Sequence, residues 1–385
     1  MTHHRRDAGF AISLALFALL LTACAPTTPP SKSLSSPHRT PTPTVASAAT
    51  GPTPRFDLGC ADILPASTIN TLFSDPVTRQ TPAQATEVFG LGNSYTYEVR
   101  SQGGLQCVWS NGKPYTDANG ASASWQGATV TIFPDAAARW AWTQQYSGTT
   151  TNSQQTCYGP VANCSLDGLS GGYYASVTLS NVNIPPTAKP GTDGHYAPPA
   201  AIAHVFDGIR AQLAAAGQPK PAWIPPVGTI PLPSTCAGFI TAPQVQSALA
   251  VSGTVLLQSP DGGTPFAEDA PQLGCGFSPG GDERVYGLLN WLPAGAWAQP
   301  DMVAAGTTPA VRAIDIAGLG KGDSAHAGTG KDGKEYLDLV LGGNLIELRM
   351  SYPAASDGLP IPGVDPSSAA KKIATQIVAN LKVAG

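Results

Sequence analysis

Two stretches of the sequence decide the fold prediction: CADILPASTINTLF at residues 60–73 and CAGFITAPQVQSAL at residues 236–249. They align without a gap from a shared Cys-Ala pair, and apolar residues fall at matching places in both. Farther along, LQCVWS at 105–110 matches LGCGFS at 273–278, each with an aromatic residue two positions after its cysteine. Recurrence of this kind is the signature of a repeated structural unit. We therefore expect two tandem repeats.

Both copies continue with the same order of predicted elements. A strand runs into a proline in ATVTIFP at residues 128–134 and in YGLLNWLP at residues 286–293. Glycine-rich turns follow, DGLSGG at 167–172 and AGLGKG at 317–322, and we equate these two turns. The order helix, strands, helix, strand pair and helix predicts the α+β class. Each repeat should form an antiparallel sheet with helices packed on one face.

Each copy is expected to close with an amphipathic helix. In the first copy, apolar residues recur at the spacing of one helical stripe; they are Ile202, Val205, Phe206, Ile209 and Leu213. In the second copy, Asp365-Pro366 predicts a helix start, because aspartate caps the first turn and proline fits its first position. The inward-facing residues of that helix are Ile373, Ile377 and Leu381. Thr241 and Gln244 have the spacing of a capping box.

The stretch EYLDLVLGGNLIELRM at residues 335–350 predicts a β-hairpin, for which two registers keep the leucines on one face. A loop of the two glycines would set Asp338 opposite Glu347. A loop of Gly343-Asn344 sets Asp338 opposite Arg349. Opposed unlike charges contribute ~0.2–1 kcal/mol and like charges oppose pairing, so we predict the second register. Glycine followed by asparagine also suits a type II′ turn.

The first 24 residues have the layout of an export signal. A short basic start precedes an apolar run from Ala8 to Leu21, and small residues lead up to Cys24. The run of about 14 residues is shorter than the ~20 that a membrane-spanning helix needs. Leu-Thr-Ala-Cys at 21–24 resembles the bacterial lipobox, in which the cysteine thiol receives a diacylglyceryl group and cleavage makes it the new N-terminus.

Residues 1–23 are therefore predicted to be a lipoprotein signal peptide, and Cys24 to carry the lipid. Stable anchoring takes two acyl chains or more, so a diacylated cysteine would hold the protein at the outer face of a cell membrane. The alternatives are an ordinary secretion signal with an incidental cysteine, and a twin-arginine signal at Arg5-Arg6.

Six further cysteines remain for the folded part, and six allow fifteen pairings. A bond built into a repeated unit has to occur within each copy, which selects one pairing. The expected disulfides are Cys60–Cys107, Cys236–Cys275 and, closing a short ring, Cys157–Cys164. We interpret them as structural bonds of a non-cytosolic protein.

Two segments are too polar or too rich in proline to form a core. Residues 24–56 carry repeated Pro, Thr and Ser, which predicts a disordered tether. Residues 218–234 form a stiff, Pro-rich linker, and we expect its Trp223 to pack on a domain. Recognition of this linker by a partner protein is an alternative. Repeat 1 then spans residues 57–217, and repeat 2 spans residues 235–385.

The predicted folded part is acidic. From Asp57 onward the chain carries 16 basic and 24 acidic residues, a net charge of −8. This charge argues against nucleic acid as a partner and against direct docking on anionic lipid. Membrane contact is expected through the lipid on Cys24 instead.

The lipobox, the tether, the Cys…Cys-x-aromatic spacing, the Gly-Leu-Gly turn and the Ala-rich last helix occur together in this sequence. In that combination the chain resembles actinobacterial lipoproteins of unknown function, over nearly all of residues 57–385. It is also similar to the extracytoplasmic sensor domains of mycobacterial serine/threonine kinases. The resemblance implies no catalytic activity, and it carries over only Cys24 and the paired cysteines. The ring closed by Cys157 and the insertion PPTAKPGTDGHYAPP depart from it.

One motif could indicate a hydrolase. Residues 168–172, Gly-Leu-Ser-Gly-Gly, match the G-x-S-x-G pattern formally, with Ser170 in the nucleophile position. That elbow needs a strand that leads into a helix. The sequence that follows, GGYYASVTLS, alternates like a strand, so we predict a glycine-rich turn without catalytic function.

No metal or cofactor site is predicted. The histidines after the tether, His195, His204 and His326, lack metal-ligand spacing, and we expect His204 at the rim of its helix or in the core. A cation at Asp323-Ser-Ala-His326 is a minor alternative. The acidic runs DGGTPFAED and GDERV are expected to be solvated loops. A sugar-binding face is the other alternative, made of the aromatic residues Trp125, Trp140, Trp142, Tyr173 and Tyr174.

Taken together, these patterns predict a lipid-anchored surface protein, extracellular apart from its lipid, that acts as a non-enzymatic binding or sensing module. Its ligand would be an unidentified molecule or protein of the cell envelope. A cell-envelope hydrolase that uses Ser170 and a structural or assembly lipoprotein are the alternatives.

Overall fold

The structure is a computed structural model that describes residues 51–384 with gaps. The gaps are residues 90–93, 118–119, 123, 138–139, 142–143, 145–150, 159–160, 184–194, 252–253, 259–273, 280–285, 310–311, 331–332 and 351–364. The predicted signal peptide, Cys24 and the predicted tether up to residue 50 lie outside the described residues. No helix in the part of the chain that the structure describes is long and apolar enough to cross a membrane.

The first half of the described chain forms an antiparallel sheet with the strand order β1-β2-β5-β8-β7-β6-β9. Its strands are β1 (Thr78–Arg79), β2 (Leu105–Ser110), β5 (Gly127–Pro134), β6 (Ser153–Tyr158), β7 (Val161–Ser170), β8 (Tyr173–Asn183) and β9 (His195–Tyr196). A separate ribbon pairs β3 (Thr116–Asp117) with β4 (Gly120–Ala121).

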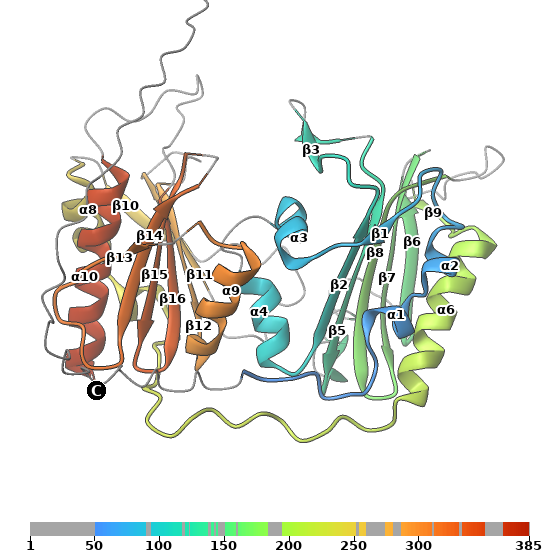
Figure 1. Ribbon diagram of the computed structural model, residues 1–385, viewed down its shortest axis with the longest axis horizontal. Coiled ribbons are helices and arrows are strands. Elements are labelled where there is room, and N and C mark those ends of the chain that lie inside the picture. The colour runs from blue at the N-terminus through green and yellow to red at the C-terminus, as the bar shows by residue number, and fades with distance from the viewer. Residues whose placement is uncertain are drawn as a thin grey trace, which may run out of the picture. The chain divides into compact units, whose positions relative to one another are not determined.

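Helices α1 (Cys60–Ile63), α2 (Ala66–Ile69) and α6 (Ala200–Ala215) lie on one face of this sheet (Figure 1). The apolar stripe predicted for α6 is confirmed, because all five of its residues are buried. They pack with the inward-facing residues of β5 and β8, such as Val130 and Val177. The segments α3 (Pro82–Phe89) and α4 (Ser94–Ser101) connect β1 to β2.

The second half forms another antiparallel sheet, with the strand order β10-β11-β12-β16-β15-β14-β13. Its strands are β10 (Val255–Gln258), β11 (Gly274–Pro279), β12 (Gly287–Leu292), β13 (Arg312–Ala313), β14 (Ser324–Thr329), β15 (Glu335–Leu341) and β16 (Asn344–Met350). A 3-10 turn, η1 (Gly295–Trp297), and α9 (Ala298–Ala305) follow β12.

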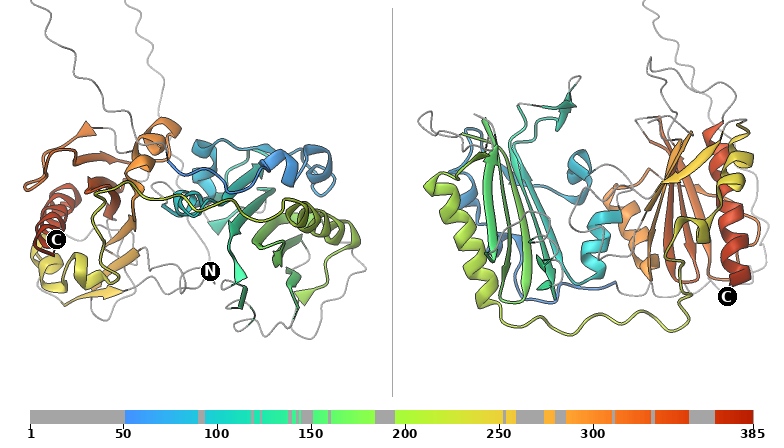
Figure 2. Two further views of the ribbon diagram at one scale, coloured as in Figure 1. Left: turned by 90° about the horizontal axis from the view of Figure 1, so that it is seen from below. Right: turned by 180° about the vertical axis from the view of Figure 1, so that it is seen from behind.

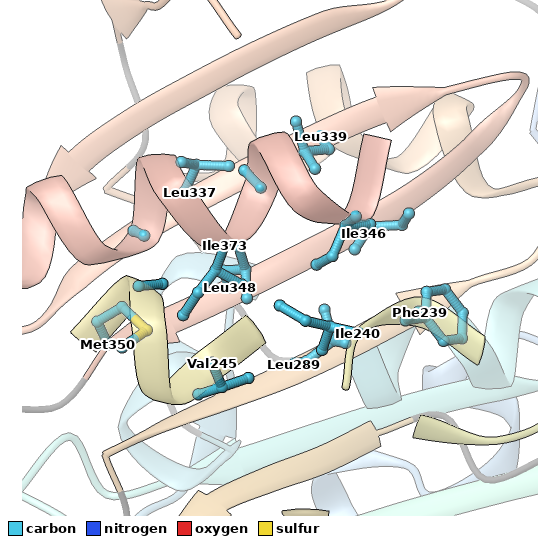
Figure 3. Packing of buried hydrophobic residues seen from close by; sticks show 14 of the residues in the cluster. Phe239, Ile240, Val245, Leu289, Leu337, Leu339, Ile346, Leu348, Met350 and Ile373 are labelled. Atoms are coloured by element: carbon cyan, nitrogen blue, oxygen red, sulfur yellow. The ribbon is translucent and has the colours of Figure 1, made fainter. Parts of the chain in front are cut away.

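One face of the second sheet is covered by α8 (Ala242–Leu249) and α10 (Pro366–Ala384), with α7 (Cys236–Phe239) beside them (Figures 1 and 2). Figure 3 shows Leu337 and Leu348 of the sheet in one cluster with Ile373 of α10. The predicted capping box of α8 is present, and the Ser367 amide donates to the Asp365 carboxylate at the start of α10. The α+β class with antiparallel sheets is therefore confirmed.

Three disulfide bonds join Cys60 to Cys107, Cys157 to Cys164 and Cys236 to Cys275, which are the pairs expected from the sequence. The first joins α1 to β2, and the last joins α7 to β11. In each half, the opening helix is thereby linked to the second strand of its sheet. The Cys157–Cys164 bond links the directly paired strands β6 and β7.

Removing the ring disulfide by Cys157→Ser/Cys164→Ser should lower the free energy of unfolding by about 2.5 kcal/mol, because the closed loop is short and constrains the unfolded chain less than a long loop does. Urea denaturation under non-reducing conditions measures the change. Cys60→Ser/Cys107→Ser is the comparison, with a larger expected loss of about 4 kcal/mol since its loop spans 47 residues. Equal losses in the two variants would contradict the loop-length argument.

The register predicted for the β15–β16 hairpin is wrong. The turn consists of Gly342 and Gly343, so Asp338 lies opposite Glu347 and two acidic residues face each other. Both glycines have positive φ, +53° and +84°, which a two-residue turn of type I′ requires at both positions. Asn344 is instead the first residue of β16, fully buried, and its side chain accepts from the Ala294 amide at 2.8 Å.

Residues 51–56, which were expected to belong to the tether, contact the folded part. The Arg55 amide donates to the Gly103 carbonyl at 2.9 Å, and Phe56 is buried with its ring 5.2 Å from that of Tyr173. Arg55 also forms an ion pair with Asp135. Residues 51–56 therefore pack with the folded part, before the predicted boundary at Asp57.

Candidate functional site

A row of polar side chains crosses four neighbouring strands of the second sheet. His326 on β14 lies opposite Asp338 on β15, Asp338 lies opposite Glu347 on β16, and Glu347 lies opposite Asn290 on β12. Because side chains alternate along a strand, this row lies on the face opposite to Leu337 and Leu348, which pack under α10. We call His326, Asp338, Glu347 and Asn290 the polar row.

The two carboxylates of the polar row are buried, since Asp338 and Glu347 are each 1% exposed. The Thr308 hydroxyl donates to Oδ2 of Asp338 at 3.3 Å. Burial raises the pKa of Asp338 to about 7, although the Thr308 hydrogen bond and the Arg349 guanidinium act in the opposite direction. Desolvation is the dominant cause, because a charged carboxylate loses its water shell in this position.

Charged and aromatic groups surround the polar row. Arg349 follows Glu347 by two residues on β16 and lies 5.9 Å from the ring of Tyr336 on β15. His326 is half-buried, and its Nδ1 has no hydrogen-bond partner among the described residues. The polar row and Arg349 together therefore place an imidazole, two carboxylates, an amide and a guanidinium on one sheet face.

Helix α4 of the first half reaches the same side of the second sheet. The Tyr97 hydroxyl lies 3.3 Å from the Thr307 hydroxyl, next in sequence to Thr308. Burial raises the pKa of Tyr97, and the Glu347 carboxylate adds a small contribution in the same direction. Tyr97 of the first half therefore lies within electrostatic reach of Glu347 in the row.

The contact between α4 and the second half is centred on Trp297. The Arg100 guanidinium lies 4.7 Å from the indole ring and forms an ion pair with Asp301 at 2.6 Å. Tyr97 packs on the same indole with 6.0 Å between ring centroids. Trp223 of the linker is packed against this cluster, which confirms the expectation that it lies on a folded part.

The polar row can exchange protons near neutral pH. Two carboxylates held opposite each other in a dry environment do not both ionise readily, so one of them retains a proton to a higher pH than an exposed acid would. A metal centre is not indicated, since the described residues contain no group of three or more His, Cys, Asp or Glu side chains that could hold an ion. Proton binding is the chemistry that these residues support.

The first sheet also has an aspartate four residues before the Gly-Gly turn of a hairpin. Asp167 on β7 lies opposite Ser176 on β8, in a row that continues to Gln154 on β6. Burial raises the pKa of Asp167, and the Tyr174 hydroxyl donates to its Oδ1 at 2.7 Å. The row in the first sheet has polar neutral residues where the second sheet has His326 and Glu347.

A sequence signal for these positions was present and was missed. LDGLSGGYYASVTL at residues 166–179 aligns without a gap with LDLVLGGNLIELRM at residues 337–350. In both hairpins the turn is a Gly-Gly pair with positive φ at both residues. The turn correspondence proposed from the sequence is therefore wrong, because AGLGKG at 317–322 lies between β13 and β14 and not in the hairpin.

Ser170 does not occupy a nucleophile elbow. It is the last residue of β7, and the chain turns through two glycines directly into β8, so a strand follows it where the elbow requires a helix. Its hydroxyl donates to the Arg210 carbonyl on α6 at 2.7 Å. The side chain thereby joins the hairpin to the helix.

Asp323 and His326 take part in different interactions. The Asp323 carboxylate accepts from the Gly320 amide at 2.8 Å and from the Gly342 amide at 2.9 Å, so it orders two turns. His326 belongs to the polar row. The side chain of His204 on α6 is exposed, so His204 is not a core residue; of His195 only the backbone in β9 is described.

The other sequence candidates do not form a surface site in the described residues. The aromatic side chains proposed for sugar binding are core residues, at 0–3% exposure: Trp125, Trp140, Tyr173 and Tyr174. Trp142 and the acidic runs at 261–269 and 281–285 lie outside the described residues.

Comparisons with known proteins give no relative for this chain. No family model matches it, and no curated protein or solved structure is significantly similar to it. The residues described above are therefore the basis for a functional proposal.

Proposed function

We propose that the chain is a lipoprotein held at the outer face of a bacterial cell membrane by acyl chains on Cys24, and that its folded part is a non-enzymatic binding or sensing module. The Leu-Thr-Ala-Cys motif after an apolar run supports the anchor. The three disulfides fit an oxidising compartment. The resemblance to actinobacterial lipoproteins agrees with both points.

The observation that carries the sensing part is the placement of Asp338 and Glu347. They face each other in the sheet at 1% exposure, on the side where Tyr97 of the first half approaches. A change in the charge of this pair alters the electrostatic environment of a contact between both halves of the chain. The first half would thereby respond to a proton or a ligand that shifts that charge.

The two halves are proposed to be copies of one unit. Six neighbouring strands have the same order relative to the chain in both sheets. The order is β1-β2-β5-β8-β7-β6 in the first sheet and β10-β11-β12-β16-β15-β14 in the second. In both halves a disulfide joins the opening helix to the second strand. The Asp167 and Asp338 positions coincide in this correspondence, whereas the outermost strands β9 and β13 occur at different points of the chain.

The anchor is tested by Cys24→Ser expressed in a bacterial host with lipoprotein processing. We expect the variant to be left uncleaved or shed into the medium, because no thiol is available to receive the diacylglyceryl group. Membrane fractionation and the mass of the N-terminal peptide measure the outcome. Thr28→Ser, a change of similar size in the predicted tether, should fractionate like the wild type.

A Cys24→Ser variant that is still processed and membrane-bound would contradict the anchor. The non-enzymatic part has its own test, since turnover of esters, glycans or peptides by the purified protein would count against it. A protein that co-purifies in fixed proportion, with no small ligand retained, would favour the assembly alternative.

A further inference from the structure

The linker carries the most exposed large apolar side chains among the described residues. Ile224 is 84% exposed and Val227 is 106% exposed, whereas the other large apolar side chains with substantial exposure lie between 38% and 45%. Pro225 and Pro226 separate the two. We call residues 224–227 the apolar strap.

The strap is fixed at both of its ends. Before it, the Lys220 amide donates to the Arg55 carbonyl at 2.8 Å, and Trp223 packs against the cluster around Trp297. After it, the Ile230 amide donates to the Gly342 carbonyl at 2.9 Å. Because proline also restricts the backbone between these points, the two apolar side chains are held away from the core.

The strap lies next to the place where the chain from Cys24 joins the folded part. Arg55 bonds directly to Lys220, and Gly51, the first described residue, lies against the indole of Trp297. Trp223, which precedes the strap, is packed on the same cluster. The predicted tether has 27 residues from Cys24 to residue 50. A coil of that length spans ~30 Å on average, so attachment at Cys24 would limit how far this region can lie from the bilayer.

We propose that the apolar strap is a second membrane contact, in which Ile224 and Val227 enter the interfacial region of the bilayer beside the lipid tether. The proposal rests on the proposed attachment at Cys24. Exposed aliphatic side chains such as these suit the boundary between headgroups and acyl chains. From Asp57 onward the chain has a net charge of −8, so apolar contact and not attraction to anionic lipid would hold the strap there.

The experiment places an environment-sensitive probe on the strap. Residues 1–24, which lie outside the compact unit that begins at Ala48, are replaced by a ten-histidine tag. The tag holds the protein on phosphatidylcholine vesicles that contain a nickel-chelating lipid. Val227→Cys is labelled with a nitrobenzoxadiazole fluorophore, and its emission is recorded with and without phospholipid that is spin-labelled near the glycerol end of the acyl chain.

We expect a blue shift of the emission on vesicles and an about two-fold quenching by the spin label, since an interfacial segment lies ~5–10 Å deep. Leu256→Cys, at an exposed position of β10, is the matched control and should show neither change. The membrane contact would be overturned if the probe at residue 227 had the same spectrum on vesicles and in buffer and was not quenched. The strap would then be expected to bind in a groove of a partner protein.

Because the histidine tag replaces acylation, this result does not depend on whether Cys24 is modified. A strap that stays in water while Cys24 proves to be acylated refutes only the second contact. A strap that inserts while Cys24 proves to be unmodified refutes the lipid anchor and supports insertion of the strap on its own.

Discussion

Asp338→Asn should abolish a pH dependence of stability. The free energy of unfolding of the wild-type protein should fall by about 3 kcal/mol from pH 5 to pH 8, and that of the variant should not. The folded-state pKa of Asp338 is raised to about 7 from an ordinary 3.8, so the folded protein binds this proton more tightly than the unfolded chain does. Its contribution is complete below the unfolded pKa and is lost as the pH rises through the folded one. Asparagine is close in shape and carries no charge at any pH.

Urea denaturation at pH 5, 6, 7 and 8 measures this effect as the difference between the two pH profiles. Asp315→Asn is the matched control, because Asp315 is exposed and its replacement should leave the profile of the wild type unchanged. The pH profile of His326→Gln shows how much of the pH dependence comes from the neighbouring imidazole. Parallel profiles for the wild type and Asp338→Asn would show that the buried pair does not titrate in this range.

The elements that depend on local patterns were predictable from the sequence. The five apolar residues of α6 recur at helical spacing, and the same residues are buried in the structure. Asp365-Pro366 at the start of α10 and the capping box at Thr241 act within a few residues of the chain. The disulfide pairs followed from comparing the two halves, for which no knowledge of the three-dimensional fold was required.

The hairpin register was missed because backbone geometry outweighed side-chain charge. A pair of opposite charges across two strands contributes ~0.2–1 kcal/mol. Forcing a residue with a side chain into the left-handed region costs ~1–2 kcal/mol, which two consecutive glycines avoid. With Gly342 and Gly343 in the turn, Asn344 is free to use its side chain, whose Nδ2 donates to the Ile230 carbonyl at 3.0 Å.

The polar row could not be recognised from local sequence, since its members come from four strands and are covered by residues far away in the chain. Asp338 on its own resembles any polar residue of an alternating strand. Asp338 accepts a hydrogen bond from Thr308, 30 residues earlier in the chain, and the environment of Glu347 includes Tyr97 from the first half. Only the alignment of Asp167 with Asp338 could have marked this position in advance.

Trp297→Ala should lower the free energy of unfolding by about 3–5 kcal/mol, the usual range for truncating a buried tryptophan. Trp297 is 5% exposed and contacts Tyr97 and Arg100 of α4, so it contributes both apolar burial and a cation–π interaction. Because these partners belong to the first half, the substitution should also uncouple the halves. Calorimetry should then show two separate unfolding transitions where the wild type shows one.

Trp140→Ala is the matched control for this uncoupling. Trp140 is equally buried, at 2% exposure, but it packs with Phe133 and Tyr174 inside the first half. Its removal should destabilise the protein by a similar amount without changing how the second half unfolds. The outcome that would contradict the prediction is the same unfolding behaviour in both variants, either one transition or two. The contact at Trp297 would then not couple the two sheets, and a change of charge at Asp338 and Glu347 would lack a route to the first half.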